Sequence, residues 1–391
     1  MSLARFFMAL PKGGASVTTP PGTSFDDTKT LVLTEEYVQS GRYLFTGSYT
    51  QNPVSKNVLH SFFNGSRHVF EAGKKVSGRR FIYNGATSAL FDIYTPPAGW
   101  GVQDVAHGHS ANGRCHLFFD EHEGFVANVG HRLMYTYSND DGVSWSTPAD
   151  VGMPPNGHKS IRVIGNVVES NGVLLKPYYS GLDEGSYGTE SARYVLRSTN
   201  GGATWAHILV EQTAEYVNEG SVMALGNTWL YAVRRETGTR GWRFYKSTDA
   251  GLTWAVQGDT QFGEPTMTES HPPHLAKFKI NGVDIFACYF VNRNTKEYKV
   301  IYGKAADVIA GISGWNLNTK LTLFDHDSYN AGGAPTFISG YGCFYHIDDT
   351  LEAKGISYLE YSQTTATHVL YFNLPTTHYG NLKTQLGITA V

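Results

Sequence analysis

An eight-residue phrase that occurs three times constrains the fold of this chain more than any other feature. The copies are SNDDGVSW at 138–145, STNGGATW at 198–205 and STDAGLTW at 247–254. A phrase that returns about every 50 to 60 residues indicates a repeated structural unit rather than three active sites. The Asp or Asn at its third position can accept hydrogen bonds from backbone N–H groups, and the following Gly can adopt a turn conformation closed to other residues.

The residues before each copy predict strands, so the phrase is expected to join two strands of one sheet. RLMYTYS, ARYVLRS and WRFYKS have strand character, and the chain contains 24 Tyr, 21 Phe and 43 Gly, which favours strands and tight turns over long helices. We therefore predict an all-β protein. Asp140, Asn200 and Asp249 are interpreted as turn-stabilising residues at an outer rim, with Trp254 buried beneath its turn.

Charge and cysteine content exclude several classes of function. The formal net charge is -3 and the basic residues are scattered, which argues against a nucleic-acid partner. The three cysteines lack paired metal-ligand spacing and cannot form a closed disulfide framework, so no metal site and no cofactor are predicted. The apolar run ARFFMAL is too short to span a membrane and has no cleavage site, so neither membrane insertion nor a secretion signal is expected.

The chain is predicted to consist of a leader and one large domain. Residues 11–30 are rich in Gly, Pro, Ser and Thr, which is typical of a flexible attachment segment. We assign residues 1–40 to this leader and residues 41–391 to a single repeat domain.

The repeated phrase resembles the Asp box of the sialidase-like six-bladed β-propellers. Strand–turn–strand units continue beyond the boxes, as in HLAKFKINGVDIFACYFVNR and TFISGYGCFYHID. Five or six units fit between about Asp104 and the C-terminus, with strands in 42–94 completing or flanking the ring. The resemblance implies a six-bladed propeller with Asp-box hairpins, and an array of independent β-sandwiches is the alternative.

The same resemblance implies a site that binds an acidic sugar. NEGSVMALGNTWLYAVRRE is similar to the sialidase segment in which a Glu precedes a strand pair and an Arg ends it. By that match Glu219 is the active-site carboxylate and Arg234 a clamp for the substrate carboxylate, with a second clamp at Arg293 in the next blade. Two guanidinium groups suit this role because they bind carboxylates in a bidentate manner and keep their charge.

The chain departs from the exo-sialidase pattern at two positions, and these departures indicate a likeness to a different group of the family. The first-blade arginine is not evident, because WGVQDVAHG places Asp104 near its position, and Gly333 lies near the position of the tyrosine nucleophile, with Tyr329 four residues earlier. These absences, the Trp100-to-Asp104 opening and the placement of His158 resemble bacteriophage endosialidases. That likeness implies a sialylated or other acidic capsular polysaccharide as partner and a place in a virion tail, and leaves a homotrimer open. A soluble protein outside a phage is the alternative localisation.

The chemistry implied is hydrolysis by direct attack of water. Glu219 would act as general base or acid, and His158 would donate to the leaving oxygen or bind a neighbouring sugar. Asp104, Asp120 and Glu121 are further acid candidates, with the status of solvated loop carboxylates as their alternative. Two other functions stay open: a non-catalytic glycan-receptor propeller, and an exo-sialidase that uses Tyr329.

Overall fold

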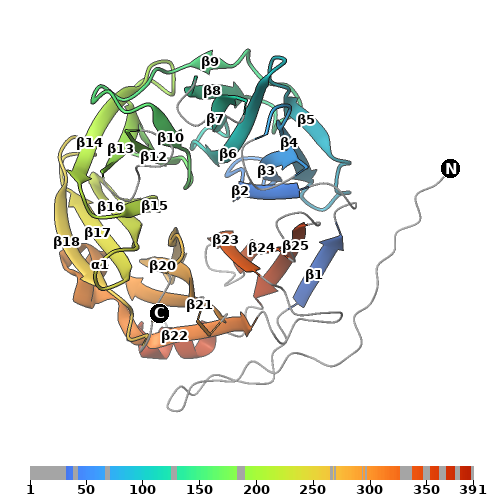
Figure 1. Cartoon of the computed structure of the whole chain (residues 1–391). Helices are drawn as coiled ribbons and strands as arrows, with labels where there is room; N and C mark the ends of the chain where they lie inside the picture. The colour runs from blue at the N-terminus through green and yellow to red at the C-terminus, as the bar shows by residue number, and fades with distance from the viewer. Residues whose placement is uncertain are drawn as a thin grey trace.

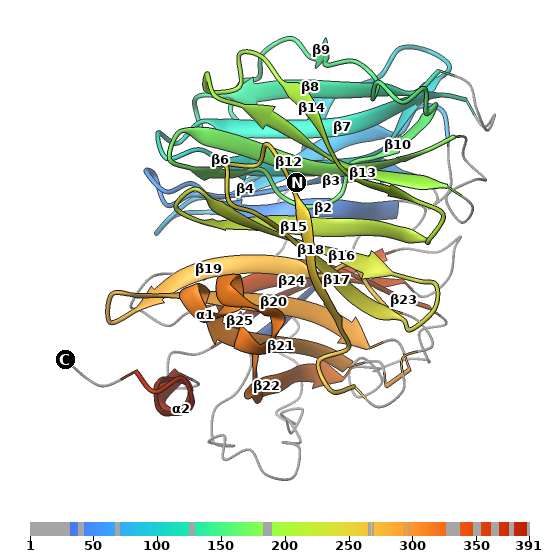
Figure 2. The same ribbon diagram turned by 90° about the vertical axis from the view of Figure 1, so that its left-hand side faces the viewer.

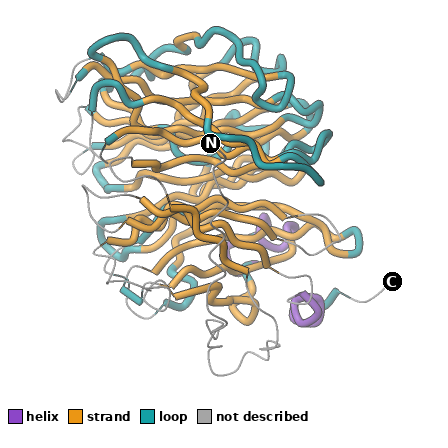
Figure 3. The backbone as a smooth tube through the Cα atoms, turned by 90° about the vertical axis from the view of Figure 1, so that its right-hand side faces the viewer, coloured by secondary structure: helices purple, strands orange, loops and turns teal. Residues whose placement is uncertain are grey.

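The computed structural model describes most of the chain from residue 32 to residue 388. The described ranges are 32–37, 43–66, 71–124, 130–182, 190–264, 267, 270–292, 294–295, 297–325, 337–346, 353–360, 367–374 and 379–388. Strands make up nearly all of these elements, and the two α-helices are short (Figure 3). The prediction of an all-β protein is therefore confirmed. No described helix is long and apolar enough to cross a membrane.

Five blades are formed by consecutive antiparallel strands around a ring (Figure 1). The first two contain β2 (Tyr43–Gln51), β3 (Val58–Gly65), β4 (Lys75–Phe81) and β5 (Phe91–Tyr94), then β6 (Trp100–His109), β7 (Cys115–Glu123), β8 (Arg132–Ser138) and β9 (Ala149–Asp150). The third contains β10 (Ser160–Arg162), β11 (Val168–Ser170), β12 (Val173–Gly181), β13 (Ser191–Ser198) and β14 (Ala206–Thr213).

The fourth and fifth blades follow the same order. The fourth contains β15 (Val217–Leu225), β16 (Thr228–Arg235), β17 (Gly241–Ser247) and β18 (Ala255–Thr260). The fifth contains β19 (His274–Ile280), β20 (Val283–Asn292), β21 (Glu297–Lys304) and β22 (Asn316–Asp325), with helix α1 (Ala305–Ala310) and the 3-10 turn η1 (Ile312–Gly314) between its last two strands. In each blade the first strand lies nearest the ring axis and the last lies at the periphery (Figure 1).

The prediction of six blades is corrected, because the structure builds five blades from consecutive strands. The remaining sheet has the order β1-β25-β24-β23 and joins the two ends of the described chain. It combines β23 (Phe337–His346), β24 (Ala353–Glu360) and β25 (Thr367–Leu374) with β1 (Val32–Tyr37), and helix α2 (Tyr379–Gln385) follows it. In this sheet the backbone N–H and C=O groups of β1 form hydrogen bonds with β25, which lies more than three hundred residues later in the chain. No repeat in the sequence predicts a pairing between such distant segments.

The count of units along the chain is also different from the expected one. From Trp100 onward the chain supplies four of the five consecutive-strand blades, and residues 43–94 form a complete blade of their own instead of flanking the ring. Strand β1 lies inside the range 1–40 assigned to the leader, whereas residues 1–31 lie outside the described residues. The division into leader and domain stays a prediction.

The hydrophobic core lies between neighbouring blades, which pack face to face (Figure 2). Between the third and fourth blades, for example, Leu175 and Val195 pack with Val222 and Tyr231, all at most 1% exposed. Side chains on both faces of these sheets are therefore buried, because each blade packs against a neighbouring blade on either side.

The three boxes form turns between the last two strands of their blades, as predicted. In the third box Asp249 accepts the backbone N–H of Leu252 and Thr253 at 3.1 and 2.9 Å, and Gly251 has a φ of 82°. The boxes do not surround a common pocket, since each lies on the peripheral side of its blade, just before the outermost strand. Trp254 is only partly buried, contrary to expectation, and its indole N–H donates to the carbonyl of Gly251 at 3.2 Å.

Candidate functional site

The candidate site lies at the end of the ring where the innermost strands begin. Three residues lie on the inner strands of three consecutive blades: Asp104 in the middle of β6, Arg162 at the end of β10, and Glu219 near the start of β15. The short strand β10 precedes β11 along the inner edge of its blade, since both pair with β12. Between β10 and β11 the chain packs directly on β15, because a Cβ added to Gly165 would lie 2.2 Å from the carbonyl oxygen of Gly220. Glycine is needed there both for this approach and for its φ of 91°.

Glu219 and Arg234, which the sialidase resemblance assigned to one site, lie side by side on neighbouring strands of the fourth blade. The Nη1 of Arg234 donates to Oε2 of Glu219 at 2.8 Å, and its Nε lies 2.9 Å from Oε1 of Glu236. Asn218 donates to the same Oε1 of Glu236 at 2.9 Å. Both Glu219 and Arg234 are buried, at 5% and 8% exposure, so this group is a desolvated ion-pair cluster on β15 and β16.

Asp104 and Asp120 form a second carboxylate group, on β6 and β7. The backbone N–H of Asp104 donates to Oδ1 of Asp120 at 2.6 Å, and both side chains are buried. Arg162 lies across them, with Nη1 at 3.4 Å from Oδ2 of Asp120 and Nε at 3.9 Å from Oδ2 of Asp104. The alternative interpretation of Asp104 and Asp120 as solvated loop carboxylates is therefore wrong, because both side chains are buried and lie on strands.

Two basic residues of this region, Arg162 and the buried Lys74, were not predicted from the sequence. Lys74 donates to Oε1 of Gln103 at 2.9 Å, and burial lowers its pKa to about 7, while the Coulombic effects of Glu71 and Asp104 raise it. It borders a cleft of about 380 Å³ that is also lined by Glu71, Lys75 and Asp92. Arg162 could have been found from the sequence, because it is the single charged residue of the apolar run SIRVIG and a charged residue in such a run is rarely buried without a function or a partner.

Glu121 and His158 are buried and lie apart from the contacts described above. Glu121 accepts the hydroxyl proton of Tyr94 and lies 3.5 Å from Nη1 of Arg132, and burial raises its pKa. The Nδ1 of His158 is 2.9 Å from the hydroxyl of Ser180, and its Nε2 is 3.6 Å from a carboxylate oxygen of Glu190. Neither residue has a described contact with Glu219.

Two of the predicted site residues, Arg293 and Tyr329, lie outside the described residues, as does Gly333. The residue before Arg293 is the buried Asn292, which ends β20 and donates to Oε2 of Glu264 at 2.7 Å. The roles assigned to Arg293 and Tyr329 stay predictions.

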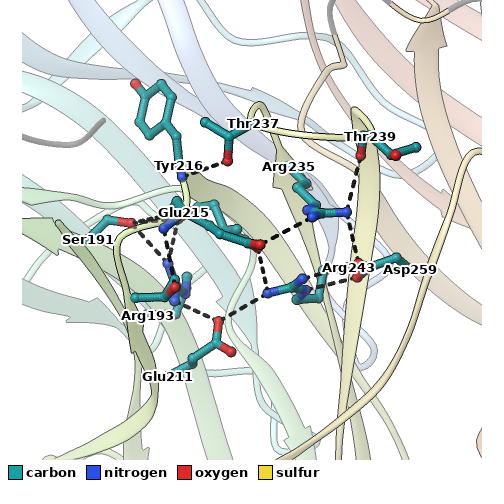
Figure 4. Close-up of polar contacts among 12 residues, drawn as sticks. Ser191, Arg193, Glu211, Glu215, Tyr216, Arg235, Thr237, Thr239, Arg243 and Asp259 are labelled. Atoms are coloured by element: carbon teal, nitrogen blue, oxygen red, sulfur yellow. Dashed lines mark hydrogen bonds and ion pairs between the residues drawn. The ribbon is translucent and has the colours of Figure 1, made fainter. Parts of the chain in front are cut away.

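A second network of ion pairs lies close to Glu219 in the sequence (Figure 4). It joins arginine and carboxylate side chains of the third and fourth blades to one another. Its guanidinium groups bind neighbouring carboxylates: Nη1 of Arg243 lies 2.9 Å from Glu215, and Nη1 of Arg235 lies 3.0 Å from Asp259. Arg193 donates to the carbonyl of Val217 at 2.9 Å. Through Arg193 this network connects the third blade to the start of β15 in the fourth.

The fold and the repeats define an all-β propeller with BNR-type repeats and a fold shared with sialidases. Residues 102–277 match the model of the BNR repeat-like domain. Among solved structures, a protein of unknown function from Dyadobacter fermentans is 14% identical with a TM-score of 0.67, over 91% of this chain and 100% of that one.

Two sialidases illustrate the shared fold. Trypanosoma rangeli sialidase is 12% identical with a TM-score of 0.68, over 94% of this chain and 61% of its own. The leech intramolecular trans-sialidase is 12% identical with a TM-score of 0.66, over 89% of this chain and 69% of its own. The chain thus spans less than two thirds of the length of the trypanosomal enzyme. No curated protein matches the sequence.

Proposed function

We propose that this protein is a glycoside hydrolase that acts on an acidic glycan at the ring end where the inner strands begin. The observation that carries the proposal is a pair of buried carboxylate groups on nearby blades, each held by an arginine: Glu219 by Arg234, and the Asp104–Asp120 pair by Arg162. Glycosidases commonly use two carboxyl groups on either side of the scissile bond.

The proposed roles follow from these contacts. Glu219 acts as general base toward water, and Arg234 orients it. The Asp104–Asp120 pair supplies the general acid, and one of its carboxyl groups gives a proton to the leaving oxygen. Arg162 and Lys74 supply positive charge toward an acidic sugar. Sialic acid is the first substrate to test, because sialidases share the fold.

A non-catalytic glycan receptor is the second candidate, and one observation favours it. Arg162 and Arg234 each contact two carboxylates of this chain, so the positive charge of each guanidinium group is already balanced within the protein. Such a balanced cluster suits rigid recognition of sugar hydroxyls as well as it suits catalysis.

Variants of adjacent arginines separate a role in the site from a structural role. Arg234→Lys keeps the charge but cannot bridge Glu219 and Glu236, whereas Arg235→Lys alters the neighbouring network and serves as the matched control. We expect Glu219→Gln to lower the rate of reducing-end release from oligosialic acid by about 10²-fold or more. Arg234→Lys should also lose most activity, and Arg235→Lys should keep it.

The binding of the same glycans, measured by calorimetry, decides between the two candidates. Full activity of folded Glu219→Gln would refute the hydrolase site. Glycan binding without turnover in the wild-type protein, lost in Arg234→Lys, would support the receptor. Endo action, inversion of configuration and association with a phage tail stay predictions: internal fragments and an inverted first product anomer would support the first two. Retention, with inactivity of Tyr329→Phe, would support the exo-sialidase alternative.

A further inference from the structure

Two histidines and a cysteine converge at the opposite end of the second blade from the candidate site. His107 and His109 alternate along β6, so they share one face of the sheet, and Cys115 on β7 pairs directly with His109. One ligand atom of each residue lies within 4.8 Å of those of the other two. At about 3.3 Å per residue, His109 lies roughly 16 Å along the strand from Asp104.

The preceding blade holds both imidazole rings by their Nδ1 atoms. The hydroxyl of Ser61 on β3 is 2.6 Å from Nδ1 of His107, and the hydroxyl of Thr50 on β2 is 3.0 Å from Nδ1 of His109. When Nδ1 carries the proton and donates it to a hydroxyl oxygen, Nε2 keeps the lone pair that binds a metal.

The Nε2 of His107 is a buried polar atom inside this cluster. It is fully buried and has no hydrogen-bond partner within the described part of the chain. A buried polar atom without a partner is unfavourable by itself, and each such atom in a folded protein calls for an explanation such as an ion. Cys115 is also fully buried beside it.

We propose that His107, His109 and Cys115 bind a divalent transition metal of the zinc class through Nε2, Nε2 and Sγ. Imidazole and thiolate ligands suit Zn²⁺ and Co²⁺, whereas Mg²⁺ and Ca²⁺ prefer oxygen ligands. Bonds of about 2.0 to 2.3 Å require the three atoms to approach one another to about 3.3 to 3.8 Å, which small side-chain rotations can supply. Three protein ligands leave the fourth tetrahedral position for water or another small ligand, on the side of the partly exposed His109.

A metal bound here would contradict the expectation, drawn from cysteine spacing, that the chain has no metal site. Its ligands are three positions in a hairpin of antiparallel strands, a pattern that lacks the short Cys-x-x-Cys spacing of common zinc sites. The expected role is structural, because the metal would join β6 to β7 and, through the two hydroxyls, fix both to the first blade.

Cobalt titration of the purified full-length protein, after treatment with a chelator, tests the proposal. We expect one equivalent of Co²⁺ to give a thiolate-to-metal charge-transfer band and the intense visible bands of tetrahedral coordination, both lost when Zn²⁺ is added. Cys115→Ser should lose the charge-transfer band, and His109→Ala should weaken Co²⁺ binding by about 100-fold. The melting temperature should rise with Zn²⁺ in the wild type and stay unchanged in His109→Ala.

Cys343→Ser is the matched control, because Sγ of Cys343 lies 3.7 Å from Nε2 of His274 and forms the other described thiol–imidazole pair of this kind. This variant should keep the band. Absence of any Co²⁺ band in the wild type overturns the proposal. A charge-transfer band that survives in Cys115→Ser and disappears in Cys343→Ser would also overturn it, because the thiolate ligand would then be Cys343. If Cys115→Ser does not fold, Thr50→Val replaces it, with an expected loss of about 10-fold in Co²⁺ affinity.

Discussion

At the scale of single residues, the three boxes show how one turn is made with two different side chains. Asp249 accepts the hydroxyl proton of Thr253 at 2.6 Å as well as its backbone N–H, and these hydrogen bonds lower the pKa of Asp249 to about 2. Asn200 accepts the backbone N–H of Thr204 at 3.0 Å and donates its own amide to the Thr204 hydroxyl at 2.8 Å. The threonine hydroxyl therefore changes from donor to acceptor while the turn is kept.

Asp249→Asn should consequently be a mild substitution. An amide can form the contacts seen at Asn200, so we expect the free energy of unfolding to change by less than about 0.5 kcal/mol at pH 7, whereas Asp249→Ala should cost about 1 to 2 kcal/mol. Urea denaturation of both variants measures this. Equal losses in the two variants would show that the charge, rather than hydrogen-bond geometry, holds the turn.

At the scale of elements, each box also contacts the blade that precedes it. In the first box Asp141 accepts hydrogen bonds from Asn52, Ser55 and Asn57, all in the β2–β3 turn. In the third box the carbonyl of Ala250 accepts a hydrogen bond from Nε of Arg197 at 2.8 Å. The boxes thus lock one blade to the next as well as closing their own hairpins.

Asp141→Asn isolates this contact between blades. Asparagine tolerates the left-handed φ of 57° at this position, but the amide group that replaces one carboxylate oxygen can no longer accept a proton from Asn57. We expect a loss of about 1 to 2 kcal/mol in unfolding free energy. In a double-mutant cycle with Asn57→Ala, a coupling energy below about 0.3 kcal/mol would mean that the hydrogen bond between Asn57 and Asp141 contributes little to stability.

At the scale of the whole molecule, buried neutral histidines set the response to acid. Burial is the main cause that lowers the pKa of His131 and His274 to about 4 and that of His122 to about 3. In the unfolded chain their pKa returns to about 6.5, so the unfolded state binds more protons between pH 6.5 and about 4. Their contribution to stability is complete above pH 6.5 and is lost as the pH falls through this window.

Unfolding near pH 5 should therefore take up about three protons through these histidines. The slope of the unfolding free energy against pH, measured in urea at pH 7.5, 6 and 5, gives the total uptake, to which other buried histidines such as His60 and His116 also contribute. The slope should therefore correspond to at least three protons, and His131→Gln should reduce it by about one proton. A stability that does not change between pH 6.5 and 4.5 would contradict the assignment of these rings as neutral.

The sequence by itself determined the features that depend on short-range chemistry. The boxes follow from turn residues within eight positions, and the all-β class follows from strand patterns beside them. The proximity of Glu219 and Arg234 was also predictable, because they lie on adjacent strands joined by a two-residue turn and pair nearly in register.

Only the tertiary structure decided the features that depend on contacts between distant segments. The pairing of β1 with β25, the placement of Arg162 over Asp104 and Asp120, and the fixing of His107 and His109 by hydroxyls of the preceding blade have no local signal. Closure of the ring brings these segments together, because each blade must bury its faces against its neighbours and each buried charge must find a partner. That is why five blades follow the order of the sequence, while the closing sheet is assembled from both ends.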